Sequence, residues 1–500
     1  MFSAWNGSGG RLPGAMALVS PTPLGGRAQN KPLLSCLLMT LRAVKRWLFA
    51  ALFMVAGCAP LPNVDVASRQ APARLGQLPP MKTFGTGPAP RAMRANADIA
   101  RDFMDLSFQM ESGRQLATLT RFEGPISLRV VGQAPVTMAP DLGRLLARLR
   151  AEAGLNITIT QSPSANINIV PLPKAKMQKA VPGAACFVVP NVRDWADFKS
   201  ARRTPRVDWS RLTERQQVAI FVPSDAAPQE LRDCLHEEIA QALGPLNDLY
   251  RLPDSVFNDD NIHAVLTGFD MLVLKTYYSR ELRNGMTRAE VARALPAILS
   301  RINPDGNARL VAHAPFTTNE WKTEIGRALG SDPAPQGRSN AARNAIALSR
   351  TGGWRDTREG FSLYALGRLL IGSEPRTAYG AFKQADSIYA SEPTTELHRA
   401  YVGVQLAAFS LLDGDAQGVM EITGTHLETA LRHENAALLA SLMMFRAEAL
   451  ELQGRAAEAR SVRLDSLGWA RYGFGSPKAI NARLREIALL NPAKHGRTSF

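Results

Sequence analysis

The sequence of 500 residues predicts an α/β (α+β) domain followed by an all-α domain. From about residue 96 to residue 303, segments with the period-two alternation of strands succeed segments with the three- and four-residue spacing of amphipathic helices. After Asn303-Pro304-Asp305-Gly306 the strand pattern stops, and from about 317 to 490 most segments are rich in Ala and Leu with helical spacing. We therefore expect domains over residues 96–303 and 304–500.

The first 57 residues predict a signal peptide. They contain six of the Lys and Arg residues and no Asp or Glu, so part of the formal charge of +15 belongs to this segment. The stretch that begins at Met39 has a basic start and an apolar core over 47–56, which is shorter than the roughly 20 residues that span a bilayer. A translation start at Met39 would leave residues 1–38 outside the protein.

The end of this segment resembles the lipobox of bacterial lipoproteins. Val55-Ala56-Gly57-Cys58 places a cysteine after small residues, so we expect a lipid on Cys58 and a membrane anchor that faces the periplasm. An Asp directly after the lipidated cysteine would favour retention of a lipoprotein in the inner membrane. This sequence has Ala59 there, which favours the outer membrane. A short buried helix before a chance cysteine is the alternative. Residues 58–95 are rich in Pro, Ala and Gly and predict a flexible linker.

Two further cysteines lie in the expected α/β domain. In an oxidising periplasm the pair Cys186 and Cys234 predicts a disulfide, and two free buried thiols are the alternative. The remaining charge is scattered Arg without a basic run or interleaved aromatic residues. We therefore expect no binding to nucleic acid.

The elements of the α/β domain follow in order from the spacing of apolar residues. One helix is expected over 96–112 and a second over 141–155, and a third starts with Pro228 in its first turn and ends at Gly244. Strands are expected over 126–132, 156–161, 166–173, 186–190 and 218–225.

The helical domain shows one stretch that resembles a tetratricopeptide repeat. Leu366-Gly367 is followed by Ala378, Phe382 and Ala385 and then by Pro393, and small residues at such positions allow helices to approach closely. We expect stacked helical hairpins that bind a protein or peptide partner. An unrelated helical bundle is the alternative.

The segment HEEIAQALGPLND, residues 236–248, raises the question of a metal site. A zinc-protease helix needs two ligands four residues apart, and counting from His236 the second position is Ala240. Counting from Glu237 fits better, because Gln241 is then the second ligand position and Glu238 the general base. Gly244 follows where a sharp turn at positive φ is expected, and Asn247 and Asp248 occupy the third ligand position.

This longer pattern, with a turn at Asp254–Asn258 that includes Ser255 and Phe257, resembles a metzincin scaffold that has lost its helix histidines. An amide oxygen is a poor zinc ligand, and three oxygen ligands are few for Ca²⁺ or Mg²⁺. We therefore expect no cofactor, with Glu238 and Asp248 bracing the turn, and a divalent cation as the alternative. Isolated histidines such as His236 and His263 are expected to be structural.

Several segments together resemble Domain of Unknown Function family 2927, which comprises bacterial secreted or lipid-anchored proteins. They are DIARDFMDLSFQMESGRQLATLTRFEGPI, CLHEEIAQALGPLND, DSVFNDD and LTGFDMLVLKTYYSRELRNGM, within residues 96–300. The resemblance implies a role for the Glu-Glu-x-x-Gln and Asn-Asp elements and for the paired cysteines. It implies no biochemical activity and does not extend to the helical domain.

The sequence therefore favours a membrane-anchored periplasmic lipoprotein with an inactive, metzincin-like (zincin-like) domain and a tetratricopeptide-like module for protein or peptide binding. The alternative is a metal-dependent peptidase or amidase that uses Glu238 as general base.

Overall fold

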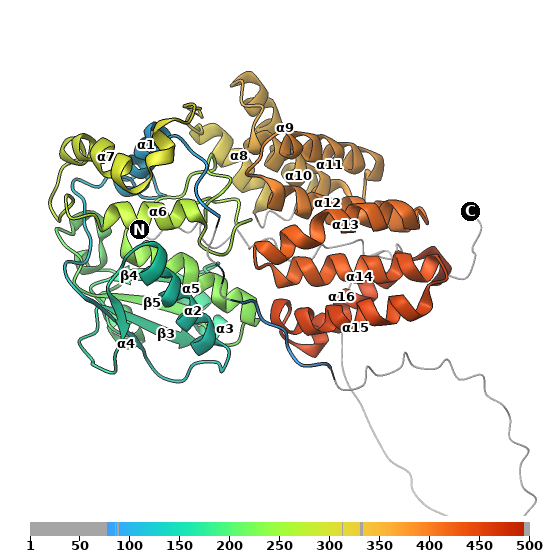
Figure 1. The fold of residues 1–500 in the computed structure, drawn as a ribbon, viewed down its shortest axis with the longest axis horizontal. Helices are drawn as coiled ribbons and strands as arrows, with labels where there is room; N and C mark the ends of the chain where they lie inside the picture. Colours follow the sequence, from blue (N-terminus) through green and yellow to red (C-terminus); the bar gives the residue numbers. More distant parts are fainter. Residues whose placement is uncertain (1–77, 86, 88–89, 313, 331–333, 495–500) are drawn as a thin grey trace, which may run out of the picture. The chain divides into compact units, whose positions relative to one another are not determined.

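The computed structural model describes residues 78–85, 87, 90–312, 314–330 and 334–494 (Figure 1). The expected signal peptide, the lipid site Cys58 and the first part of the expected linker lie outside these ranges. In the part of the chain that the structure describes, no helix has the length and apolar character needed to cross a bilayer.

A five-stranded sheet forms the centre of the α/β domain, in the order β2-β1-β3-β5-β4. Neighbouring strands run parallel except β4, which pairs antiparallel with β5 at one edge. All six residues of β3 and of β5 are buried, as expected for strands covered on both faces. The bounds are β1 Ile126–Val130, β2 Ile157–Ile159, β3 Ile167–Leu172, β4 Phe187–Pro190 and β5 Val218–Pro223.

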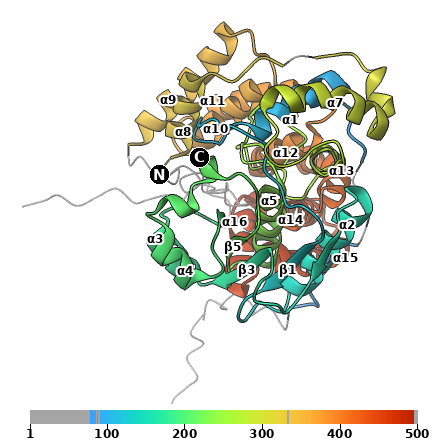
Figure 2. The ribbon, with the colours of Figure 1, turned by 90° about the vertical axis from the view of Figure 1, so that its left-hand side faces the viewer.

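Helices cover both faces of this sheet (Figures 1 and 2). Ile167, Ile169 and Ile220 pack into one core with the helices that carry the candidate site, whereas Val170 and Phe221 pack into a second core under α3 and α4. The helices of the first core are α1 (Asn96–Ser107), α2 (Met138–Glu152), α5 (Pro228–Leu243), α6 (Gly268–Tyr277) and α7 (Arg288–Ile302). Those of the second are α3 (Lys174–Ala180) and α4 (Trp195–Ala201). The expected α/β architecture is confirmed.

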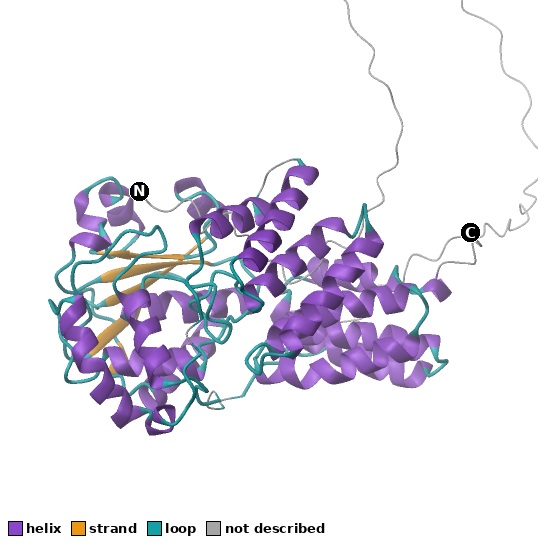
Figure 3. Cartoon of the chain, turned by 90° about the horizontal axis from the view of Figure 1, so that it is seen from above, coloured by secondary structure: helices purple, strands orange, loops and turns teal. Residues whose placement is uncertain are grey.

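The described residues after α7 form an all-helical region without strands (Figure 3). The helices are α8 (Asn319–Leu329), α9 (Pro335–Thr351), α10 (Thr357–Leu370), α11 (Pro375–Ala390), α12 (Glu396–Leu412), α13 (Ala416–Arg432), α14 (Ala436–Leu452), α15 (Ala456–Gly473) and α16 (Pro477–Ala488). From α8 to α15, each helix packs extensively on the next one along the chain. The turns at Gly414 and Gly454 use positive φ angles, which glycine adopts without strain.

Small residues bring these helices close together. A Cβ atom added to Gly367 on α10 would lie 2.6 Å from Cε1 of Phe382 on α11, and Gly403 on α12 meets the ring of His426 on α13 in the same manner. The expected role of Gly367 and Phe382 in close helix packing is therefore confirmed.

The helical region packs directly against the α/β domain, and the described residues from Pro79 to Lys494 belong to one compact unit. Gln229 on α5 donates to Asn435 Oδ1 at 3.1 Å and accepts from the Ala437 amide at 2.9 Å, next to the start of α14. His398 Nε2 on α12 lies 2.9 Å from an Asp260 carboxylate oxygen. Buried polar contacts therefore join the two regions.

The chain before α1 crosses this contact. The Lys82 amide donates to the Gly468 carbonyl at 3.0 Å, Arg471 donates to the Pro79 carbonyl at 2.7 Å, and Phe84 stacks on Trp469 with ring centroids 4.8 Å apart. The expectation of a flexible linker up to residue 95 is therefore wrong for Pro79, Lys82 and Phe84, because apolar and hydrogen-bond contacts hold them on α15.

The packing at Gly367 gives a testable prediction. Gly367→Ala is expected to lower the thermal unfolding midpoint by an amount equivalent to about 1–3 kcal/mol, because the methyl group overlaps the Phe382 ring. Gly380→Ala is the matched control, since Gly380 is also inside a helix and has no atom within 4 Å of its added Cβ. The control should be neutral or slightly stabilising. Equal effects of the two changes would contradict the close packing.

Candidate functional site

Helix α5 carries the candidate site and is almost completely enclosed. Of its 16 residues 13 are buried, including charged and polar ones. Strands β4 and β5, helix α2 and helix α15 all pack against it. Each polar side chain of α5 therefore needs a partner inside the protein.

His236 illustrates this requirement. Its Nδ1 accepts a hydrogen bond from the Leu266 amide at 3.1 Å, and burial, followed by the nearby Arg232, holds its pKa well below the usual value. The neutral ring is thus an acceptor that fixes the loop before α6. The position agrees with the structural role expected for His236.

The predicted disulfide is confirmed. Cys186 and Cys234 are bonded, with their Cα atoms 5.9 Å apart. Cys186 directly precedes β4, and Cys234 lies in the first half of α5. The bond therefore ties the edge strand of the sheet to the candidate helix.

Two carboxylates lie beside this disulfide. Within the described ranges, one group of three potential metal ligands has donor atoms within 4.8 Å of one another, namely Cys186, Glu237 and Glu238. The sulfur of Cys186 is used in the disulfide and cannot act as a thiolate ligand. What remains is a pair of neighbouring carboxylates.

Two further candidate ligand positions, Asn247 and Asp248, make internal contacts. Asn247 Nδ2 donates to the Asp105 carbonyl at 2.9 Å, and both residues are buried. Burial raises the pKa of Asp248 well above its usual range, and the neighbouring carboxylates and a hydrogen bond with Glu111 raise it further. Burial and these neighbours therefore favour the protonated form of Asp248. The residues present do not fit the nitrogen and sulfur ligand set that zinc prefers.

Gly244 ends α5, but not for the expected reason. Its φ of −167° is extended, so the expectation of a positive φ is wrong. A Cβ atom at this position would lie 2.8 Å from Cδ2 of Tyr277. Glycine is required because the Tyr277 ring packs directly on the backbone.

The turn at Asp254–Asn258 is held by a buried carboxylate. Asp270 on α6 accepts from Ser255 Oγ, from the Val256 amide at 3.1 Å and from the Thr267 amide at 2.7 Å. Ser255 Oγ in turn accepts from the Phe257 amide at 3.0 Å. The structure thus places Ser255 and Phe257 in a hydrogen-bonded turn that α6 anchors.

A cleft of about 420 Å³ opens beside α5, and we call it the α5 cleft. Glu238 and Gln241 line it from α5, and Phe187 and Val188 line it from the edge strand β4. Its other walls are Met110, Glu111, Ser112, Arg114, Val181, Ala184, Arg202, Arg203, Thr204, Pro205, Val207, Asp208, Trp209, Arg211 and Leu246. The structure therefore brings Glu238 and Gln241 together, whereas Asn247 and Asp248 do not line this cleft.

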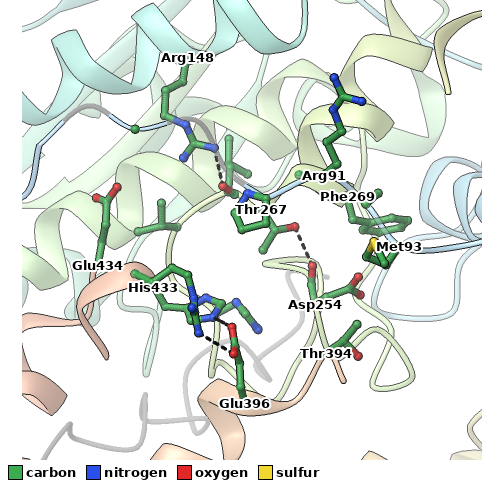
Figure 4. Close-up of a pocket in the computed structure, with 18 of the residues that line it drawn as sticks. Arg91, Met93, Arg148, Asp254, Thr267, Phe269, Thr394, Glu396, His433 and Glu434 are labelled. Atoms are coloured by element: carbon green, nitrogen blue, oxygen red, sulfur yellow. Dashed lines mark hydrogen bonds and ion pairs between the residues drawn. The ribbon is translucent and has the colours of Figure 1, made fainter. Parts of the chain in front are cut away.

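A second cavity of about 810 Å³ lies where the α/β domain meets the helical region (Figure 4). Asp254 and Thr267 line it from the α/β domain, and Glu396 and His433 line it from the helical region. His433 Nε2 lies 2.7 Å from Glu396 Oε1. His263 also lines it and is buried, and its Nε2 has no hydrogen-bond partner in the described chain. Sequence patterns could not show this cavity, since its residues are far apart in the chain.

The α/β domain matches one known family. Residues 96–297 match the family model described as "Protein of unknown function (DUF2927)". The expected resemblance is confirmed over almost the same range. No curated protein and no solved structure matches the chain.

Asp259, near the site, gives a prediction about pH. Burial raises its pKa to about 6, Glu237 and Asp260 act in the same direction, and Lys322 opposes the shift. A raised folded-state pKa means that this carboxyl stabilises the fold fully below about pH 4 and loses that contribution as the pH rises through about 6. Asp259→Asn should therefore raise the unfolding midpoint near neutral pH and leave it unchanged near pH 4.

The control is Asp305→Asn, because the Asp305 side chain is 67% exposed. Asp305→Asn should leave the unfolding midpoint unchanged both near neutral pH and near pH 4. A destabilising effect of Asp259→Asn at neutral pH would mean that the attraction to Lys322 outweighs burial.

Proposed function

We propose that this protein is a membrane-anchored periplasmic lipoprotein that binds an extended protein or peptide segment without metal-dependent hydrolysis. One observation carries the second part of the proposal. The sulfur of Cys186 is engaged in the disulfide, so Glu237 and Glu238 remain there as two neighbouring carboxylates, and Asp248 forms a carboxyl pair with Glu111. A helix whose ligand positions serve the fold in this way suits binding better than metal chemistry.

The order of the elements supports a degenerate metzincin-like domain. Strand β5 leads into α5, the chain bends at Gly244, and the Leu249 amide then donates to the Phe257 carbonyl at 2.9 Å. This bond brings the segment after Asp248 against the turn before α6. This contact is compatible with the metzincin-like scaffold that we propose.

The α5 cleft suits an extended ligand. Strand β4 is hydrogen-bonded to β5 on one side, and among the described strands it has no neighbour on the other. Phe187 and Val188 of β4 line the cleft together with Glu238 of α5. A peptide that runs along β4 could form main-chain hydrogen bonds with that edge and place its side chains in the cleft.

The helical region supports a tetratricopeptide-like arrangement through its repeated contacts between glycine and an aromatic ring. Most residues of α10, α12 and α14 are buried, and α/β residues such as Gln229 and Asp260 contact the starts of α14 and α12. We therefore assign the extended ligand to the α5 cleft. A partner of the helical region itself would use α11, α13 and α15, which are less buried.

A second candidate is a hydrolase with Glu238 as general base. It is favoured by the position of this carboxylate, which is only 3% exposed and lines a cleft of substrate size. A general base must also lie near the reacting atom of a bound substrate.

The proposal predicts binding without turnover. The chain extracted from membranes should bind labelled unstructured peptides, and Met110→Trp should weaken binding because it fills the cleft from a half-buried position. Val136→Trp between β1 and α2, where the valine is 91% exposed and lines neither cavity, is the control and should bind normally. Fluorescence polarisation measures binding, and mass spectrometry of the same samples measures cleavage.

Cleavage that disappears in Glu238→Gln would establish the hydrolase instead. An unmodified Cys58 in the extracted chain would contradict the lipid anchor.

A further inference from the structure

The rim of the α5 cleft carries arginine from several segments. Arg114 precedes β1, and Arg202, Arg203 and Arg211 follow α4. These four arginines line the same cleft, although Arg114 is far from the other three in the sequence.

Much of this positive charge is not neutralised inside the protein. Arg203 is exposed and forms no ion pair with any described residue. Arg211 is 67% exposed and lies 3.9 Å from Asp208, which also pairs with Arg114 at 2.8 Å. The single negative charge of Asp208 therefore faces two arginine side chains. Arg202 donates one hydrogen bond to the Ala180 carbonyl, which carries no net charge.

The three acids that line the cleft neutralise only part of the charge of its four arginines. Hydrogen bonds from Ser210 and the nearby Arg114 hold the pKa of Asp208 below its usual value against the effect of partial burial, so it contributes one negative charge. Glu111 is hydrogen-bonded to Asp248 within a carboxyl pair. Glu238 is buried in the wall beside α5 rather than at the exposed rim.

The inner wall of the cleft carries hydrogen-bond acceptors, whereas the rim carries positive charge. Glu238 provides carboxylate oxygens and Gln241 an amide oxygen, and both accept hydrogen bonds. A small free anion that entered the cleft would meet the Glu238 carboxylate. A peptide can bind to both the inner wall and the rim. Its backbone N–H groups can donate hydrogen bonds to the acceptors of the inner wall, and its acidic side chains can pair with the arginines of the rim.

Apolar side chains complete the cleft. Phe187 and Val188 of β4 line one wall, and Trp209 and Leu246 line others. Such walls favour a ligand that also carries apolar residues, as peptides do.

We propose that the α5 cleft binds an extended acidic peptide segment, with its acidic side chains against Arg203 and Arg211. This inference rests on the proposed peptide-binding function and names the class of ligand. Because the rim arginines are exposed, their attraction should be sensitive to salt.

The test uses the full chain and labelled peptides of equal length in which Glu alternates with apolar residues, together with versions that have Gln or Lys in place of Glu. We expect the Glu peptide to bind about tenfold more tightly than the Gln peptide at low salt and the Lys peptide to bind most weakly. The double variant Arg203→Glu and Arg211→Glu should remove the preference for Glu over Gln. Arg280→Glu, at a position with an 88% exposed side chain outside the cleft, should retain it.

Equal affinity for the Glu and Gln peptides would overturn the acidic preference and leave peptide binding intact. Absence of binding to all three peptides would overturn the proposed function as well. Competition by free glutamate as effective as that by the Glu peptide would also contradict the inference, because the cleft would then bind a simple anion.

Discussion

The near-complete enclosure of α5 is the constraint on which the rest of the structure depends. A buried polar group without a partner costs about 1–3 kcal/mol, so the polar residues of this helix determine much of what surrounds it. Gln229 accepts a hydrogen bond from the start of α14, and His236 accepts one from the loop before α6. The disulfide at Cys234 then fixes the helix to the edge of the sheet. A sequence that resembles a catalytic helix thus serves first as the central support of the protein.

This constraint also explains why the two regions of the chain form one unit. The sheet and α2 cover one part of α5, and α15 covers another. The segment around Phe84 adds to this contact by packing on Trp469. The helical region is therefore part of the environment of α5, and residues of both regions line the larger cavity.

Local patterns were sufficient to predict the strands, the bounds of α5 and the disulfide, since alternation, capping signals and an even cysteine pair are properties of the sequence itself. They also identified Gly244 as special but suggested the wrong reason, because the Tyr277 ring that requires it lies 33 positions further along the chain. Similarly, no spacing rule pairs Glu111 with Asp248. Contacts between distant segments decided which candidate residues face a cleft and which support the fold.

The most direct test of the account is the metal content of the intact protein after equilibration with Zn²⁺ and Ca²⁺ and removal of the free ions by gel filtration. The account predicts far less than one bound ion per chain, because the sulfur of Cys186 is engaged in the disulfide and the two neighbouring carboxylates of Glu237 and Glu238 are too few ligands for either ion. One ion per chain that is lost when Glu237 and Gln241 are both changed to Ala would contradict it.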